Sequence, residues 1–263
     1  MSRVKEIIDE IEKIAPKFLK EDYDNVGMMV GDEEAEVKKV LMALDCTKEV
    51  IEEASNLGCE MIITHHPLFF RKPNSIVKGD FIGDKVLKLI KEDINLYSCH
   101  TNLDSAQNGI NETIVNMLGY KSDAIMEQSR RKDYENCGIG RIVKFEEAVS
   151  LNDVINNVKK TLNIKNLRVA RGCNKIKTIA VINGSGQDFF GMAKSMGADC
   201  IITGDTTYHF VSDYKEMGIS IIDAGHFGTE YAVFLKTLEF LNHKFKDVEF
   251  IASKESKDPY EFV

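Results

Sequence analysis

The apolar residues of this chain recur in two stretches that share one order of segments. In each stretch a short apolar run (VLMAL at 40–44, TIAVI at 178–182) is followed by apolar positions at helical spacing and then by a second apolar run (EMIIT at 60–64, DCIIT at 199–203). Short uninterrupted apolar runs are typical of buried strands, and the intervening spacing is that of an amphipathic helix. Each stretch therefore predicts a βαβ unit, with two parallel strands joined by a right-handed crossover.

Each of the two predicted helices ends at a glycine, Gly58 or Gly197. Glycine readily adopts the left-handed conformation that closes a helix. The apolar positions expected to face the core are Val50, Ile51, Ala54 and Leu57 in the first helix and Phe189, Phe190, Ala193 and Met196 in the second.

The two stretches also align on each other without a gap, with Lys38 on Lys177, an offset of 139 residues. Further on, INLYSCHTNLD, from Ile94, is similar to ISIIDAGHFGTE, from Ile219. The sequence therefore predicts an α/β protein of two similar lobes made by internal duplication, with sheets that contain parallel strands and are flanked by helices. The predicted lobes are residues 1–125 plus 225–263 and residues 126–224.

The rest of the chain offers shorter patterns. Strands are indicated by the runs GIGRIVKF, NLRVARG and VEFIA, and helices by SLNDVINNVKKTLNI and EYAVFLKTLEFLNHKF. The N-terminal segment is amphipathic and charged, unlike a signal peptide, and no long apolar run indicates a membrane span. Six cysteines without a C-x-x-C pair favour reduced, buried thiols. A cytoplasmic protein without membrane contacts is therefore expected.

Composition narrows the classes of partner. Of the 263 residues, 43% are hydrophobic and 29% charged, as in an ordinary globular protein. The net charge of −8 argues against a broad nucleic-acid-binding surface, which needs clustered Lys and Arg.

Unusual polar residues follow the predicted strands. His65 and His66 come directly after EMIIT, Asp104 after NLYSC, and His226 and Glu230 after SIIDA. Ligands of parallel sheets gather at the carboxyl ends of strands. Three imidazoles and two carboxylates suit two divalent ions such as Zn, Mn, Fe, Co or Ni rather than Ca or Mg alone.

Ordinary roles for the same residues stay open. The histidine pair could lie on the surface or cap a helix, and Asp104 could be an N-cap. Glu230 could be an ordinary acidic residue in the first turn of a helix, where the helix dipole favours negative charge. These alternatives weaken together, because four of the six histidines fall at strand ends beside carboxylates.

At these residues the chain resembles the NIF3-like (DUF34) family, in its compact form. The motifs that carry the resemblance are YDNVGMMVGD (23–32), ITHHPLFF (63–70), HTNLD (100–104), GSG (184–186), ADCIITGDTTYH (198–209) and DAGHFGTE (223–230). Tyr23 stands where the family often has Trp, and Phe227 stands where it often has Tyr. The detail of the pocket wall can therefore differ from that of other family members.

The resemblance implies a dinuclear centre held by His65, His66, Asp104, His226 and Glu230, with Glu230 as the bridge. It also implies two α/β lobes, a C-terminal segment that returns to the first lobe, and a homohexameric ring whose metal sites face an inner cavity.

Similar proteins are known as GTP cyclohydrolase 1 type 2 homologues, so the resemblance implies metal-dependent hydrolytic opening of a nucleotide or related heterocycle. His100 or His209 would be a general acid or base, or would support a ligand. The candidate substrate-binding residues are Asn25, Gly184, Ser185, Gly186, Asp205 and Tyr208.

No Walker motif identifies GTP. The turn at Gly184–Gly186 could cradle a phosphate with its backbone amides, but a tight strand-to-helix turn is the commoner role of such a sequence. Two other functions stay open: a metal carrier or insertion factor, and a regulatory ring that binds protein or nucleic acid. The acidic charge counts against the last of these.

Overall fold

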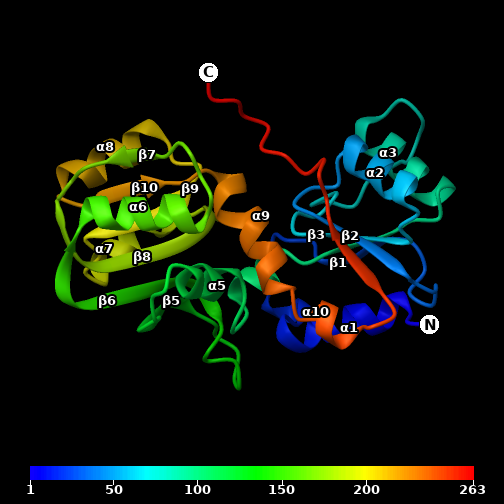
Figure 1. The fold of residues 1–263 in the computed structure, drawn as a ribbon, viewed down its shortest axis with the longest axis horizontal. Coiled ribbons are helices and arrows are strands. Elements are labelled where there is room, and N and C mark those ends of the chain that lie inside the picture. Colours follow the sequence, from blue (N-terminus) through cyan, green and yellow to red (C-terminus); the bar gives the residue numbers. More distant parts are fainter. The chain divides into compact units, whose positions relative to one another are not determined.

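The computed structural model describes residues 1–263, and the chain divides into two compact units (Figure 1). The first comprises Met1–Leu103 and Phe234–Lys257, and the second comprises Asp104–Val233 and Asp258–Val263. Each unit contains one mixed β-sheet with flanking helices, which confirms the α/β class. The lobe boundaries at residues 125 and 225 stay a prediction.

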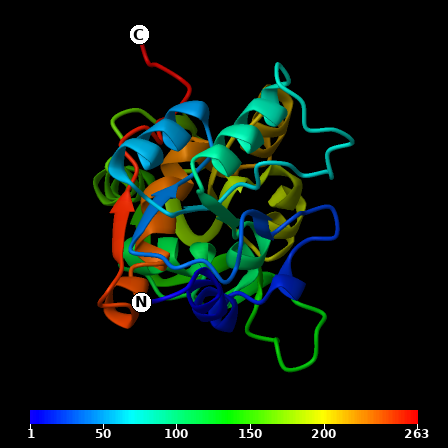
Figure 2. The same cartoon turned by 90° about the vertical axis from the view of Figure 1, so that its right-hand side faces the viewer.

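The first unit holds a five-stranded sheet in the order β1-β4-β3-β2-β11. Its central strands are parallel, and only β1 runs antiparallel, beside β4. The C-terminal strand β11 pairs with β2 at one edge, where it appears in red in Figure 2. The strands are β1 (Gly27–Val30), β2 (Lys39–Ala43), β3 (Met61–Thr64), β4 (Asn95–Ser98) and β11 (Glu249–Ala252).

Helices cover both faces of this sheet. On one face α2 and α3 pack their apolar side chains against the strands, and α1 and α10 lie on the other (Figures 1 and 2). The predicted helix α2 begins where the Thr47 hydroxyl accepts a hydrogen bond from the Val50 N–H and ends at Gly58, whose φ is 65°. The helices are α1 (Val4–Ile14), the 3-10 turn η1 (Lys17–Leu19), α2 (Lys48–Leu57), α3 (Phe81–Lys91) and α10 (Leu241–Lys244).

The second unit holds a six-stranded sheet in the order β5-β6-β8-β9-β10-β7. Strands β8, β9 and β10 are parallel, while β5, β6 and β7 run antiparallel to their neighbours. The strands are β5 (Ala124–Gln128), β6 (Gly138–Ser150), β7 (Arg168–Ala170), β8 (Lys175–Ser185), β9 (Cys200–Gly204) and β10 (Ser220–Asp223).

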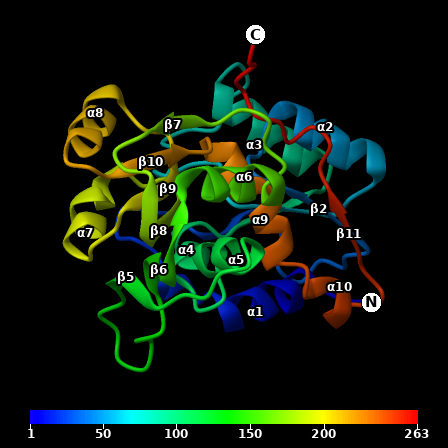
Figure 3. The same ribbon diagram turned by 60° about the vertical axis from the view of Figure 1, so that its left-hand side comes forward.

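The helices of the second unit surround this sheet (Figure 3). Two further helices, α4 and α9, each contain a boundary between the units. The helices are α4 (Thr101–Ser105), α5 (Ile110–Met117), α6 (Leu151–Thr161), η2 (Gln187–Phe189), α7 (Phe190–Ser195), α8 (Tyr208–Glu216) and α9 (His226–Thr237).

Strand pairing reproduces the duplication to the residue. Val40 lies opposite Met61 in the first sheet, and Ile179 lies opposite Cys200 in the second. Ile179 and Cys200 each lie 139 residues beyond their counterparts in the first sheet, which is the offset that aligns Lys38 with Lys177. The order β2-β3-β4-β1 in the first sheet also matches β8-β9-β10-β7 in the second, with β1 and β7 as the antiparallel edges. The two units therefore share the topology of these four strands.

Two further findings bear on the chain as a whole. All six cysteines are free thiols, and five of them are buried. None of the helices combines the length and the apolar character that crossing a membrane would require.

Candidate metal centre

Three histidines of the first unit lie together at the carboxyl ends of two neighbouring strands of its sheet. His65 and His66 follow β3, and His100 follows β4, a parallel neighbour. The ring centroids of His65 lie 5.1 Å from those of both His66 and His100. One ring nitrogen from each of the three lies within 4.8 Å of the others, so the group could hold a metal ion.

The Nδ1 atoms of the histidine pair are both held by oxygen acceptors. Nδ1 of His65 lies 2.9 Å from the Cys99 carbonyl oxygen, and Nδ1 of His66 lies 2.9 Å from Oδ1 of Asp45. A carbonyl or an ionised carboxylate only accepts hydrogen bonds, so the proton of each neutral ring is assigned to Nδ1. A ring held in this way presents Nε2 as its ligand atom when it binds a metal, which is the usual arrangement of a metal-binding histidine.

The third histidine faces a buried carboxylate. Nδ1 of His100 lies 3.0 Å from Oδ1 of Asp24, whose side chain is fully buried. Oδ2 of Asp24 accepts hydrogen bonds from the N–H and the hydroxyl of Thr101. Burial raises the pKa of Asp24, but the bond to His100 and those from Thr101 outweigh it and hold that pKa at about 2. Asp24 is therefore ionised and fixes the orientation of the His100 ring.

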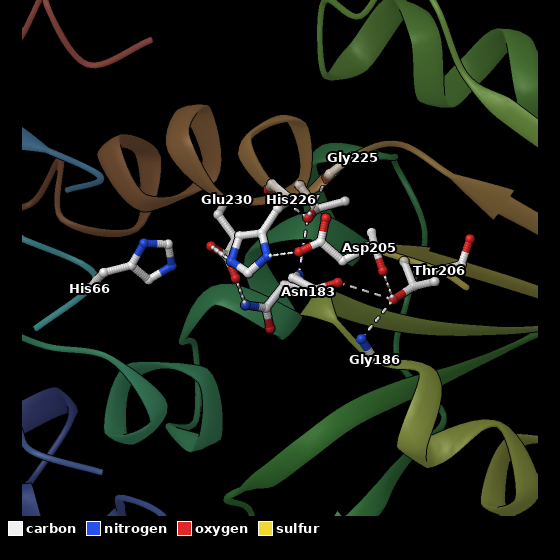
Figure 4. Close-up of polar contacts among 12 residues, drawn as sticks. His66, Asn183, Gly186, Asp205, Thr206, Gly225, His226 and Glu230 are labelled. Carbon is white, nitrogen blue, oxygen red and sulfur yellow. Dashed lines mark hydrogen bonds and ion pairs between the residues drawn. The ribbon is translucent and has the colours of Figure 1, made fainter. Parts of the chain in front are cut away.

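In the second unit, His226 and Glu230 lie one turn apart at the start of α9 (Figure 4). Nε2 of His226 is 2.9 Å from Oε2 of Glu230, and Nδ1 of His226 is 2.7 Å from Oδ2 of Asp205. Asp205 follows β9 directly, so the parallel pairing of β9 with β10 brings it to the segment that starts α9. The i, i+4 spacing predicted for His226 and Glu230 is confirmed as one helix face.

Asn183, in β8, joins two carboxylates of the second unit. Its Nδ2 donates to Oδ1 of Asp104 at 2.9 Å and to Oε1 of Glu230 at 2.9 Å. Asp104 is 7% exposed and Glu230 is 2% exposed. Glu230 also lies 2.9 Å from Nε2 of His226, so two carboxylates and an imidazole gather here, and ligands of these types suit a divalent cation. The donor set therefore fits a metal ion.

The glycine turn after β8 makes room for Glu230. Gly184 has φ +55°, and a Cβ atom there would lie 2.2 Å from Oε1 of Glu230. The Gly184 N–H donates to the Thr229 hydroxyl at 3.0 Å, and the Gly186 N–H donates to the Thr203 hydroxyl at 3.1 Å. Both amides are thus used within the fold, so the tight turn has an internal structural reason.

The sequence and the fold both coincide with one known family. The chain matches the Duf34/NIF3 (NGG1p interacting factor 3) family model over residues 2–259. It belongs to this family. A relative from Clostridium perfringens is 55% identical over 263 residues, covering 99% of this chain and 100% of the relative. One from Clostridium acetobutylicum is 49% identical and covers 99% of this chain and 98% of the relative. Both are named GTP cyclohydrolase 1 type 2 homolog.

Solved structures of the family share the fold. The Staphylococcus aureus hypothetical protein SA1388 superimposes with a TM-score of 0.88 at 32% identity, covering 99% of each chain. Reduced HcgD from Methanocaldococcus jannaschii superimposes with a TM-score of 0.83 at 33% identity, covering 96% of this chain and 98% of that one.

Several family-motif residues have roles within the fold. The Asn25 amide donates to the Phe69 carbonyl at 2.8 Å and so holds the loop after the histidine pair. Ser185 is exposed at the end of β8. On α8, Tyr208 is 79% exposed and its ring contacts that of His209, which is also exposed. The use of these residues in binding or catalysis stays a prediction.

Three residues that shape the site were not singled out from the sequence: Asn183, Asp45 and Asp24. Asp45 follows the strand β2 closely, as the histidine pair follows β3, so its position at a strand end was a usable signal. Asn183 lies within a strand, and Asp24 lies in the YDN motif far from His100 along the chain, so neither carries a local signal of its role.

Proposed function

We propose that this protein binds two divalent metal ions per chain through His65, His66, Asp104, His226 and Glu230, with Glu230 as the bridge. The observation that carries the proposal is that Nδ1 of each of the three histidines is held by an oxygen acceptor. That hydrogen bond directs Nε2 to act as the ligand atom. The mixture of imidazole and carboxylate suits Zn, Mn, Fe, Co or Ni.

We further propose that the bound ions serve a hydrolase that opens a nucleotide or a related heterocycle. The names of the Clostridium relatives support this reaction type. When bound, divalent ions supply Lewis acidity, which activates water for attack at neutral pH. The chain itself supplies His100, whose ring is oriented by Asp24 so that Nε2 exchanges a proton with the reacting group.

The resemblance that supplies the ligand set also supports a homohexamer. In that assembly the centres of six chains would face one cavity. The oligomeric state is measured independently of the metal content, by light scattering on the purified protein.

The test is metal content per chain by elemental mass spectrometry, on protein purified without added metal and after reconstitution. About two ions are expected in the wild type, falling sharply in Glu230→Gln. The matched control is Glu216→Gln, because Glu216 is exposed on α8. Absence of stoichiometric metal after reconstitution with all five metals would contradict the metal centre.

Turnover is then assayed as release of formate from GTP by the loaded protein. Release in the wild type, with loss in His100→Gln at unchanged metal content, is the expected result. Full metal occupancy with no turnover of any nucleotide would contradict the hydrolase and leave the metal-carrier function standing.

A further inference from the structure

A second feature of the chain is a pocket within the second unit. It has a volume of about 390 Å³ and is lined by residues of β7, α8 and β10. These three elements lie together at one side of the second sheet (Figure 3). The volume is in the range of small-molecule sites, roughly 300–1,000 Å³. Its lining combines three charged side chains (Arg168, Lys215, Asp223), three hydroxyls (Thr206, Thr207, Ser212) and an aliphatic wall.

The negative charge in this pocket is already satisfied. Asp223 is 3% exposed, and its Oδ2 accepts hydrogen bonds from the N–H and the hydroxyl of Thr206 and from Arg168. Its Oδ1 accepts from the Gly225 N–H at 2.9 Å. This carboxylate is therefore well supplied with donors and is paired with Arg168.

The positive charges are only partly used. Arg168 binds Asp223 and the Thr206 carbonyl through the single atom Nη2, and its side chain is 65% exposed. Its Nε and Nη1 donors remain available. Lys215 lines the pocket, is exposed and forms no ion pair. With Asp223 matched to Arg168, the ammonium of Lys215 leaves the pocket with net positive charge although the chain as a whole is at −8.

We propose that this pocket binds the phosphate group of a phosphorylated small molecule. A guanidinium with open donors pairs with phosphate oxygens, a lysine adds a point charge, and the Ser212 hydroxyl is a further donor. The Tyr208 ring, 79% exposed at the same pocket, offers an aromatic face for a ring joined to that phosphate. A nucleoside monophosphate has both parts.

The pocket is also linked to the candidate metal centre along the chain. Thr206 directly follows Asp205, the partner of His226 (Figure 4). Phosphate binding here would position the rest of a substrate near His226. That last statement rests on the proposed function, whereas phosphate binding itself does not.

The test is calorimetric titration of the full chain with guanosine 5′-monophosphate, guanosine and inorganic phosphate, in the presence of a chelator. We expect the monophosphate to bind, guanosine to bind at least about tenfold more weakly, and Lys215→Gln to weaken the monophosphate by about tenfold. Lys177→Gln, at an exposed position at the start of β8, removes the same charge and should leave binding unchanged. Affinity should fall with added salt.

Three outcomes would overturn the phosphate site: no binding of the monophosphate, equal affinity for guanosine, or equal affinity in Lys215→Gln. Binding only to metal-loaded protein would also overturn it, because the phosphate would then sit on the ions. Since the titration is done without metal, its failure is distinguishable from failure of the metal centre, which the metal content decides separately.

Discussion

Oδ2 of Asp205 lies 2.7 Å from Nδ1 of His226, and the opposite nitrogen of the same ring lies 2.9 Å from Glu230. A carboxylate that is not itself a proposed ligand thus holds Nδ1 of a proposed ligand and fixes the orientation of its ring. Asp45 stands in the same relation to His66 in the first unit. In each unit, a carboxylate that follows one strand thus orients a histidine that follows the neighbouring strand.

The first prediction concerns Asp205. Asp205→Asn should weaken metal affinity by about 10- to 100-fold, because the amide no longer favours the Nδ1-protonated ring as a carboxylate does. The measurement is metal retained against a graded chelator series. Asp213→Asn, an exposed position on α8, is the control and should behave as wild type. Unchanged retention in Asp205→Asn would show that this hydrogen bond does not support the site.

The second prediction concerns Asn183. In metal-free protein, Asn183→Ala should lower the free energy of unfolding by about 2 kcal/mol, since Asp104 and Glu230 both lose a buried donor. Urea unfolding in chelator measures this, with Asn156→Ala on the exposed side of α6 as the control. A loss no larger than in the control would argue that contacts other than the amide hold the two carboxylates in place.

The third prediction separates backbone strain from steric clash. Gly184 and Gly197 both have positive φ, 55° and 83°, but only at Gly184 does a Cβ meet another atom, Oε1 of Glu230 at 2.2 Å. Both alanine variants should be destabilised by roughly 1 kcal/mol from strain. Gly184→Ala should in addition lose metal, because Glu230 must move. Equal metal content in the two variants would show that Glu230 can move away from the added Cβ atom without loss of metal.

The fourth prediction is a pH dependence. The pKa of Asp24 is about 2 in the folded protein against an ordinary value of 3.8, so its ionised form stabilises the fold. This contribution, about 2 kcal/mol, is complete at neutral pH and is lost mostly as pH falls from about 4 to about 2. Asp24→Asn should therefore unfold more easily than wild type at pH 7.

The difference between Asp24→Asn and wild type should narrow as unfolding is measured at successively lower pH. Asp22→Asn, an exposed neighbour, should show no difference at any pH. A gap that stays constant down to pH 3 would mean that the effect of the substitution comes from shape rather than from charge.

The duplicated βαβ units were predictable because their signals are local. Apolar runs marked β2, β3, β8 and β9, and Gly58 and Gly197 marked the helix ends, where both adopt positive φ. The edge pairing of β1 and β7 was different, although the run NLRVARG had already indicated β7 as a strand. The two strands pair antiparallel with β4 and β10, and such pairing depends on residues distant in sequence. The helical spacing also placed Leu57 in the core, whereas its side chain is 39% exposed at the end of α2.

The site divides in the same way. The positions of His65, His66, His226 and Glu230 at strand ends could be predicted from the order of apolar runs alone. Asn183 could not, because it acquires its role only when β8 and α9 bring Glu230 to its amide. The pocket beside α8 is likewise invisible in the sequence, since Arg168 and Lys215 are distant along the chain and meet only across folded elements.

The sequence by itself determined the family, the α/β class and the candidate ligands, because periodicity, glycine punctuation and motif spacing are properties of short segments. Tertiary structure decided which oxygen holds each histidine, which amide joins the two carboxylates and which cations are left uncompensated. These depend on which strands become neighbours, and hydrogen bonding and charge compensation act between neighbours in space rather than in sequence.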